Sequence, residues 1–557
     1  MSLQATQGSA GGMPVLILKE GASQTKGRDA QKNNITAAKL ISEIVRTSLG
    51  PRGMDKMLVD SLGDVTITND GATILKEIDV QHPAAKMMVE ISKATDNEVG
   101  DGTTSVVILA GALIEKAEDL ITKDVHPTII VDGYRKSATK AIEILNNIAQ
   151  KIDANDKEQL TRIAKTAIQT KLISKEADQV SQLVVNAILQ VSEQIADGKG
   201  SRVDLDDIKV EKKAGGSLAD TKLIKGIVLD KEVVHGGMPK RIEKAKIALV
   251  NSALEIEKTE FDAKININSP DQMNMFLEEE NRMLKNMVDK IVATGANVVI
   301  CQKGIDDIAQ HYLAKTSILT VRRVKESDMT KLARATGARI VNNLDDLSDK
   351  DLGSADLVEE RKVETDKWVF IEGCKHPKAV TVLIRGGSQR VIDEAERSVH
   401  DALMVTKDVI EKPAIVAGGG APESYIAGKV RDWANTLSGR EQLAAEKFAE
   451  SMEIIPLTLA ENAGMDPIDT ITELRARQGK GSKWTGVDVK SAKVADVSKL
   501  DIVEPLSVKE QIVKSATEAA SMILRIDDVI ASSKSAGGPP GGGMPPGAGG
   551  MGGGMDY

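Results

Sequence analysis

The sequence predicts a multi-domain α+β protein in which a largely helical body is interrupted by an α/β segment. The chain has 557 residues, and at about 150 residues per domain this corresponds to roughly three to four domains. Apolar residues keep helical spacing over most of the chain up to residue 200 and again over 389–533. Between about 225 and 375, short β-prone runs alternate with helical stretches, which indicates an α/β module.

Local patterns define the elements of the N-terminal part. The periodicity predicts a helix over 28–48, which a Gly-Pro pair ends. Residues 58–68 predict a hairpin, because two short β-prone runs flank a Gly-Asp turn. Helical patterns then dominate from 71 to 200, and one strand is expected at 14–19, after a loose polar arm.

The α/β segment is predicted from three β-prone runs, 224–229, 246–250 and 297–300, with a helix over 281–291. The last 21 residues, 537–557, contain 11 Gly, 4 Pro and 3 Met. Such a segment cannot bury enough apolar surface to offset its chain entropy, so we expect a disordered tail.

Composition excludes several classes of protein. Lysine and arginine number 73 against 82 acidic residues, a balance of 73 − 82 = −9, and only 11 residues are aromatic. Nucleic-acid binding through bulk charge or base stacking is therefore not expected. The longest apolar stretch, 106–114, has nine residues, about half of a transmembrane helix.

The sequence also predicts a cytoplasmic protein. No secretory signal is visible at the N-terminus, where the first 18 residues contain no Lys or Arg. The two cysteines, Cys301 and Cys374, are too few for a disulfide framework or a cysteine metal site. We expect two reduced, buried thiols.

Familiar catalytic motifs are missing from the sequence. It contains no G-x-x-x-x-G-K-[ST], no H-E-x-x-H and no G-x-S-x-G. A formal G-x-G-x-x-G begins at Gly547, but it lies in the predicted tail without a strand or helix around it. These absences argue against a Walker-type NTPase, a zinc protease and a serine hydrolase.

One glycine-rich turn does indicate chemistry. Residues 99–105, with Asp101 between two glycines, lead directly into the apolar run 106–114. Glycine permits close backbone approach, and the free N–H groups at a helix start bind anions. Asp101 beside a phosphate requires a cation between them, so phosphate with Mg²⁺ fits the motif. A capped buried helix without a ligand remains the alternative. Similar turns occur at 49–53, 69–73 and 417–422.

Five motifs together closely resemble the group II chaperonins: 49–60, 68–75, 98–105, 226–239 and 416–423. The match extends in order over 15–533, and the Gly-Met tail resembles the archaeal thermosome branch.

The resemblance implies the chaperonin fold, with three domains, two of which are assembled from separate parts of the chain. They are a largely helical equatorial domain (1–150 and 409–533), a small α/β intermediate domain (151–225 and 376–408), an α/β apical domain (226–375) with a helical lid protrusion at about 256–288, and the tail 534–557.

The resemblance also implies an ATPase site with ATP and Mg²⁺ as cofactors. Asp101 would bind the Mg²⁺, Asp70 and Asp401 would position the attacking water, and Lys171 would sense the γ-phosphate. The expected nucleotide-binding residues are Leu49, Gly50, Pro51, Gly102, Thr103, Thr104 and Ser105 toward the phosphates, and Gly419, Gly486, Asp488 and Glu504 toward the nucleoside. The sequence around Lys171 departs from the family's Ser-rich form, so an ordinary lysine remains the alternative there.

The expected lid carries an apolar surface. Met273, Met275 and Phe276 are candidates for the tip of the protrusion, whereas Met283, Leu284 and Met287 are expected to form the core face of one helix. Methionine-rich surfaces adapt to varied apolar partners, and a built-in lid implies that no separate lid co-chaperonin is needed.

The implied partners are non-native polypeptide clients and other subunits, identical or paralogous, in a stacked double ring of eight or nine per ring. The termini of one subunit would pair with the 58–68 hairpin of the next by strand addition. ATP hydrolysis would drive closure around the client. Two alternatives are an ATPase ring with a role other than folding and a structural protein-binding assembly without catalysis.

Overall fold

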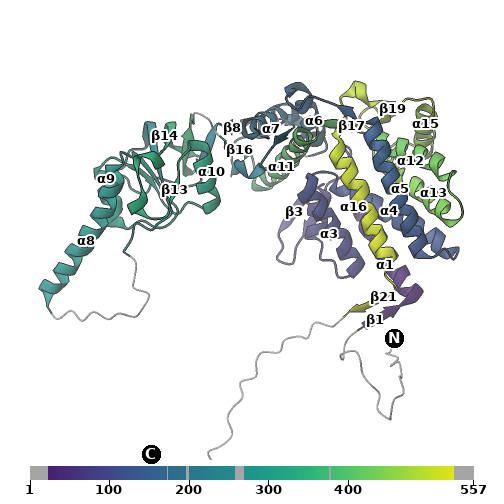
Figure 1. Ribbon diagram of the computed structural model, residues 1–557, viewed down its shortest axis with the longest axis horizontal. Helices are drawn as coiled ribbons and strands as arrows, with labels where there is room; N and C mark the ends of the chain where they lie inside the picture. The colour runs from purple at the N-terminus through teal and green to yellow at the C-terminus, as the bar shows by residue number, and fades with distance from the viewer. Residues whose placement is uncertain (1–22, 172, 196–199, 257–268, 375–377, 532–557) are drawn as a thin grey trace, which may run out of the picture.

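The structure is a computed structural model that describes residues 23–171, 173–195, 200–256, 269–374 and 378–531. The strand expected at 14–19, the tail from 534 and part of the expected protrusion lie outside the described residues. Figure 1 shows three bodies in a row: a helical body, a connecting module and an outer module that ends in a long projecting helix.

Both ends of the chain build the helical body. Its helices are α1 (Gly27–Arg46), α2 (Gly71–Glu77), α3 (Pro83–Val99), α4 (Thr103–Thr122), α5 (Pro127–Ile148), α12 (Ala421–Ala434), α13 (Arg440–Met452), α14 (Ile454–Asn462), α15 (Pro467–Gly479) and α16 (Leu506–Leu524). Its strands are β1 (Ser23–Lys26), β2 (Lys56–Val59), β3 (Val65–Thr68), β4 (Gln150–Lys151), β17 (Ala414–Ala417), β18 (Thr485–Asp488), β19 (Lys493–Asp496), β20 (Val503–Pro505) and β21 (Asp528–Ala531).

Helix α4 is the centre of this body. Its run 106–114 is apolar on every face and is buried throughout, as expected for a helix surrounded by others. Helix α4 packs against α1 from the N-terminal part of the chain and against α13 and α16 from the C-terminal part. One continuous core therefore joins residues 35–148 to residues 416–524.

The connecting module carries its own core, built again from two parts of the chain. Its helices are α6 (Lys157–Gln169), α7 (Ala177–Val191) and α11 (Gln389–Glu411), and its strands are β5 (Glu193–Gln194), β6 (Ser201–Arg202), β7 (Ile208–Ala214), β8 (Lys222–Ile224) and β16 (Val380–Gly386). The main sheet has the order β7-β16-β8, with β7 parallel and β8 antiparallel to β16. Strand β7 is not among the predicted strands, because only its first four residues alternate and two consecutive lysines then end the pattern.

The outer module is an α/β layer around one larger sheet. Its strands are β9 (Gly226–Leu229), β10 (Arg241–Val250), β11 (Val298–Cys301), β12 (Leu319–Val321), β13 (Ile340–Val341), β14 (Gly353–Val363) and β15 (Asp366–Glu372), and its helices are α8 (Pro270–Ala293), α9 (Asp307–Lys315) and α10 (Glu326–Thr336). The sheet order is β12-β11-β10-β14-β15-β9, with β13 beside β10. Parallel pairing joins β10, β11 and β12, and antiparallel pairing joins β14, β15 and β9.

The β-prone run 224–229 is not a single strand, which corrects the expectation. It divides at Lys225: residues up to Ile224 pair with β16 of the connecting module, whereas Gly226 onward pairs with β15 of the outer module. Gly226 has a φ of +148°, and a Cβ there would lie 2.0 Å from the carbonyl oxygen of Ile371. The chain can change sheets here because this residue has no side chain.

A buried lysine joins the connecting and outer modules. The Nζ atom of Lys209, on β7, donates to the carbonyl oxygen of Val228 at 2.8 Å and lies 2.9 Å from Glu211 and 3.0 Å from Asp328. Thr381, on β16, donates from Oγ1 to the carbonyl oxygen of Gly226 at 3.0 Å. The two carboxylates thus pair the buried ammonium group of Lys209 where the two sheets meet.

The predicted hairpin over 58–68 is confirmed as the antiparallel pair β2–β3. It projects from the helical body with Met57 and Val59 exposed. Strand β1 pairs with β21, so the two ends of the described chain leave the body together (Figure 1).

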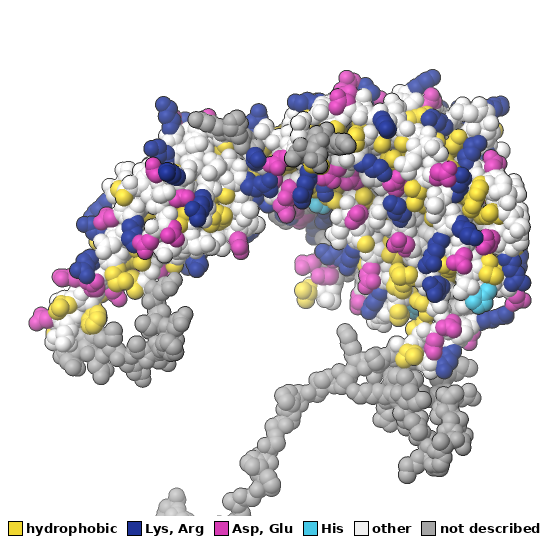
Figure 2. Space-filling view, in the orientation of Figure 1, with side chains coloured by type: hydrophobic (Ala, Val, Ile, Leu, Met, Phe, Trp, Pro, Cys, Tyr) yellow, Lys and Arg dark blue, Asp and Glu magenta, His cyan; other side chains and the backbone are white. Residues whose placement is uncertain are grey.

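Helix α8 projects from the outer module with an apolar far end, visible at the lower left of Figure 2. Met273, Met275 and Phe276 are exposed there, and Leu284 is buried in the core, as expected. The expectation for Met283 is wrong: it is 44% exposed. One residue along a helix turns a side chain by about 100°, so Met283 points away when Leu284 faces the core.

The described chain contains no helix that combines the length and apolar character needed to cross a membrane. Cys301 and Cys374 are buried and not disulfide-bonded, as predicted. Burial raises the pKa of each thiol to about 11, which keeps both protonated near neutrality.

Replacement of Phe448 by alanine tests the shared core of the helical body. Phe448, on α13, is fully buried and packs edge-on against Tyr134 of α5 at 6.0 Å. Phe448→Ala should lower the free energy of unfolding by about 3–5 kcal/mol, measured by chemical denaturation. Leu443→Ala, at a 42% exposed position on the same helix, should change it by less than about 0.5 kcal/mol; equal losses would contradict the assignment of the core.

Candidate nucleotide site

A cavity of about 1180 Å³, including the part open to solvent, lies where the helical body meets the connecting module. Its walls come from the loop after α1, the start of α4, the end of α6, the loop before α12, the β18–β19 turn and β20. Of the residues predicted for the site, Leu49, Gly50, Pro51, Asp101, Gly102, Thr103, Thr104, Ser105, Lys171, Gly419, Asp488 and Glu504 line this cavity. The tertiary structure brings them together from positions 49 to 504.

The start of α4 forms one wall. Gly102 is its N-cap with a φ of +77°, and Thr103 begins the helix. The first N–H groups of a helix have no acceptor within it, so those of this turn are available to an anion in the cavity. Gly71 allows close packing behind this turn, because a Cβ there would lie 2.6 Å from Oγ1 of Thr104.

Asp70 stands behind the α4 turn as the N-cap of α2. Its carboxylate accepts from the backbone N–H of Thr73 at 2.8 Å and from Oγ1 of Thr103 at 3.0 Å. Burial alone would raise the pKa of Asp70, but the charge of Lys171 and these two donors outweigh it and lower the pKa below its ordinary value. Asp70 is therefore ionised at neutral pH.

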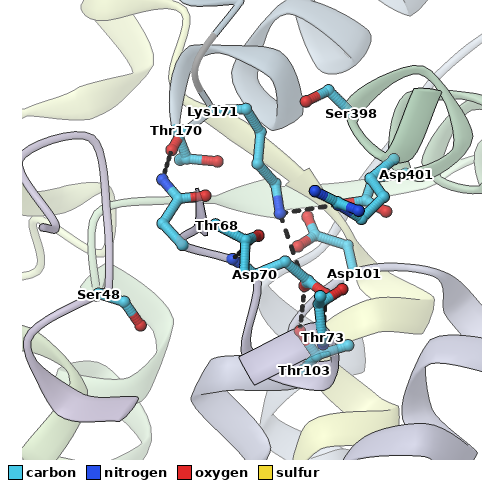
Figure 3. Close-up of polar contacts among 12 residues, drawn as sticks. Ser48, Thr68, Asp70, Thr73, Asp101, Thr103, Thr170, Lys171, Ser398 and Asp401 are labelled. Atoms are coloured by element: carbon cyan, nitrogen blue, oxygen red, sulfur yellow. Dashed lines mark hydrogen bonds and ion pairs between the residues drawn. The ribbon is translucent and has the colours of Figure 1, made fainter. Parts of the chain in front are cut away.

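Lys171 lies between two carboxylates (Figure 3). Its Nζ is 2.8 Å from Oδ2 of Asp401, on α11, and 3.7 Å from Oδ1 of Asp70. Burial would lower the pKa of Lys171, but Asp401, Asp70 and Asp101 outweigh it and raise the pKa well above its ordinary value. The backbone beside it is anchored, because Nδ2 of Asn69 donates to the carbonyl oxygen of Thr170 at 2.7 Å.

Asp401 differs from Asp70 in its protonation. Burial raises the pKa of Asp401 to about 8, Lys171 opposes the rise, and Asp70 and Asp101 add to it. Asp401 is only 6% exposed, so it is not an ordinary surface carboxylate of α11. Neither Asp70 nor Asp401 lines the cavity directly; both lie behind Lys171.

Asp101 lies on the cavity wall, and its Oδ1 accepts from the N–H of Gly102 at 2.6 Å. Three carboxylates, Asp70, Asp101 and Asp401, thus surround a single lysine, which leaves an excess of negative charge. Carboxylates and hydroxyls are ligands that Mg²⁺ accepts, commonly one or two carboxylates completed by phosphate oxygens and water. The donors present fit a hard divalent cation at Asp101.

The opposite wall is a loop of three glycines. Gly419 has a φ of +62°, and a Cβ there would lie 2.8 Å from the carbonyl oxygen of Val487. Gly486 supports this loop from behind and is not on the cavity wall, which corrects the expectation of direct contact: a Cβ on Gly486 would lie 2.9 Å from the carbonyl oxygen of Gly419.

Asp488 lines the cavity but also closes the β18–β19 turn. Its Oδ1 accepts from the N–H groups of Lys490 and Ser491 at 3.1 and 3.2 Å. Burial acts to raise the pKa of Asp488, and these donors reverse the shift and lower the pKa. The local turn explains the aspartate at this position.

Sequence reasoning missed several residues of the wall, among them Asn69, Thr170, Lys490 and Lys509. Lys509 is 5% exposed and lies between Glu423 and Glu504. In the sequence it is one of many lysines on amphipathic helices, and no local pattern marks it as buried. Its position depends on how α16, α12 and β20 pack.

Both chain ends close a helical body, a connecting module links it to an outer module with a projecting helix, and a cavity lies at the first junction (Figure 1). This arrangement is that of a chaperonin subunit. The chain belongs to the TCP-1/cpn60 chaperonin family, whose pattern it matches over residues 41–534. The family inferred from the five motifs is therefore confirmed.

Individual relatives agree with this assignment. The chain is 60% identical to thermosome subunit alpha of Archaeoglobus fulgidus over 520 residues, which cover 93% of this chain and 95% of that protein. It is 59% identical to a thermosome subunit of Methanopyrus kandleri over the same coverage, and 56% identical to thermosome subunit alpha of Sulfolobus acidocaldarius over 528 residues, 93% and 94% of the two chains. The chain is an archaeal-type group II chaperonin that acts in protein folding.

The protonation of Asp401 predicts a pH dependence of stability. An acid whose pKa is raised in the folded state binds its proton more tightly there than in the unfolded chain, so its contribution to stability falls as pH rises from about 4 to 8. Asp401→Asn cannot lose that proton. In thermal unfolding without nucleotide and with a chelator, the variant should lose less stability than the wild type between pH 5 and pH 8; parallel curves would contradict the raised pKa.

Proposed function

We propose that this chaperonin subunit binds ATP with Mg²⁺ in the cavity and hydrolyses it to drive enclosure of non-native polypeptides. The observation that carries the proposal is the group formed by Lys171, Asp70 and Asp401 beside the free N–H groups of α4. One lysine, two buried carboxylates in different protonation states and a helix N-terminus are the parts that phosphoryl transfer to water needs.

The phosphates would lie against the start of α4. The N–H and hydroxyl groups of Thr103, Thr104 and Ser105 would donate to phosphate oxygens, and Gly50 and Pro51 would close the other side. Asp101 would hold the Mg²⁺, which supplies charge neutralisation of the phosphates when bound. The charge of Lys171 would face the terminal phosphate.

Asp70 and Asp401 would have different roles toward the attacking water. Asp70, ionised and fixed by Thr73 and Thr103, would orient the water by accepting one of its hydrogens. Asp401, with a pKa of about 8, exchanges its proton near neutrality, which is the range that suits a general base. Displacement of Lys171 toward a phosphate would remove its ion pair with Asp401 and increase the affinity of Asp401 for a proton, which suits a proton acceptor.

The site would couple hydrolysis to domain movement. Asp401 lies on α11 and Lys171 follows α6, and both helices belong to the core of the connecting module. Asp70 and Asp101 belong to the helical body. Catalysis therefore requires the two bodies to be docked, so closure and hydrolysis would occur together.

At the other end of the cavity, Gly419, Asp488 and Glu504 would contact the nucleoside, with Gly486 as support. A carboxylate such as Glu504 repels phosphate, whereas the α4 turn attracts it. This difference in charge supports the orientation of the nucleotide.

We assign the helical body to the equatorial domain (1–150 and 409–533), the connecting module to the intermediate domain (151–225 and 376–408) and the outer module to the apical domain (226–375). Three separate hydrophobic cores support this division. The exposed Met273, Met275 and Phe276 at the end of α8 would form part of a built-in lid, with no separate lid co-chaperonin.

Assembly into a stacked double ring of eight or nine subunits, identical or paralogous, is proposed from the family. The exposed edge of the β2–β3 hairpin and the β1–β21 pair support strand addition between neighbours. A cytoplasmic location is proposed as well, with two unpaired thiols as its support. Images of the particles would count the subunits in each ring.

Asp401→Ala should abolish hydrolysis and leave nucleotide binding and assembly intact. Loss of a proton acceptor lowers turnover by about 10²–10⁴-fold, measured as steady-state phosphate release. Calorimetry with ADP and particle images serve as the controls. Turnover at the wild-type rate would remove Asp401 from the mechanism and would favour a different general base.

Refolding of a denatured client, measured with and without ATP, tests the role of the cycle. The yield of active client should rise only when ATP is present, and Asp401→Ala should not support it. Hydrolysis without any gain in refolding would favour an ATPase ring with another role. Client capture without phosphate release would instead favour a passive assembly.

A further inference from the structure

Helix α11 carries a row of three buried side chains where it meets the helical body. Asp401, Met404 and Asp408 are spaced by three and four residues, so they follow one another along one face of the helix. Asp401 contacts Lys171 at the cavity. Farther along, Oδ2 of Asp408 accepts from Oγ of Ser507, on α16 of the helical body, at 3.1 Å. Met404 lies between these two polar contacts.

Met404 rests on a residue that has no side chain. Gly100 is the C-cap of α3 with a φ of +64°, and a Cβ there would lie 2.2 Å from Cβ and 2.4 Å from Cγ of Met404. Met404 is buried, yet among the described residues it belongs neither to the core of the helical body nor to that of the connecting module. It is therefore a contact between the two bodies and not part of the filling of either.

This contact lies next to the groups proposed for catalysis. Gly100 directly precedes Asp101, which lines the cavity, and Met404 is about one helical turn beyond Asp401. Close-packed carbon atoms resist further approach, so a side chain seated on bare backbone limits how near α11 can come to the helical body. The limit applies at the same turn of α11 that presents Asp401.

We propose that Met404, seated on Gly100, is a positioning residue that sets the depth at which α11 docks and thereby places the Asp401 carboxylate for hydrolysis. The inference rests on the hydrolysis proposed above and deepens it. Glycine at position 100 meets two requirements: it takes the left-handed conformation that ends α3, and it leaves room for Met404. A side chain at position 100 would push α11 outward and carry Asp401 with it.

Gly100→Ala in the full-length protein tests this inference, with Gly337→Ala as the matched control. Gly337 is the C-cap of α10 with a φ of +78°, but a Cβ there would meet nothing within 4 Å. The control therefore carries the backbone strain without the clash. Gly100→Ala should lower kcat for phosphate release about tenfold or more, because a small displacement of a catalytic group is costly. Gly337→Ala should keep the wild-type kcat.

Nucleotide affinity separates positioning from damage to the cavity wall. Calorimetry with ADP and Mg²⁺ should give Gly100→Ala a Kd within about threefold of the wild type, since only the chemical step requires α11 to be seated. Particle images check that each variant assembles.

Variants of Met404 connect the effect to its partner. Adding Met404→Gly to Gly100→Ala removes the atoms that the new Cβ would meet, so the double variant should turn over at least about threefold faster than Gly100→Ala alone. Met404→Ala covers the case in which Gly100→Ala fails to assemble: kcat should fall about fivefold with an unchanged Kd, and Met404→Leu, of similar volume, should retain most of the turnover.

Several outcomes overturn the inference while the proposed function stands. They are a wild-type kcat in Gly100→Ala or Met404→Ala, equal losses in Gly100→Ala and Gly337→Ala, and no recovery in the double variant. Weaker ADP binding by Gly100→Ala with an unchanged kcat also overturns it, because the glycine would then act through Asp101. Absence of phosphate release by the wild type contradicts the proposed function itself.

Discussion

The ammonium group of Lys171 is held between carboxylates that belong to different bodies of the subunit. Asp70 lies at the start of α2 in the helical body, whereas Asp401 lies on α11 in the connecting module. Three carboxylates share this one cation, and two of them, Asp70 and Asp401, are buried. Because a buried charge must be paired, the docking of the two bodies and the protonation of these carboxylates depend on each other. Any group that attracts Lys171 changes both.

The packing of the rest of the fold brings these charged groups together. Helix α4 is apolar on all sides, so both ends of the chain pack around it, and its first turn is left open at the edge of that core. The connecting module then positions α6 and α11 over the same edge. Farther out, the buried Lys209 holds the sheets of the connecting and outer modules together. Charged groups therefore mark both junctions, while apolar cores fill the bodies between them.

A second buried lysine, Lys509, is also paired with two carboxylates, but the arrangement differs from that at Lys171. At Lys171 one cation faces an excess of carboxylates next to the first turn of α4, and the balance of charge would change if an anion bound there. At Lys509 the two carboxylates, Glu423 and Glu504, lie 2.8 and 2.6 Å from the ammonium group. The first arrangement suits a group that responds to its ligand, and the second suits a rigid wall.

The sequence alone determined the fold class, the hairpin at 58–68, the buried run 106–114 and the family, because local periodicity and contiguous motifs carry that information. It also indicated Asp101 as a candidate cation ligand, since glycines and hydroxyl residues surround it. Tertiary structure decided what depends on distant segments: that Gly486 supports the loop from behind, that the run 224–229 divides between two sheets, and that Lys509 is buried between Glu423 and Glu504. Burial and charge pairing across hundreds of residues leave no local pattern, so only packing shows which lysines and carboxylates meet.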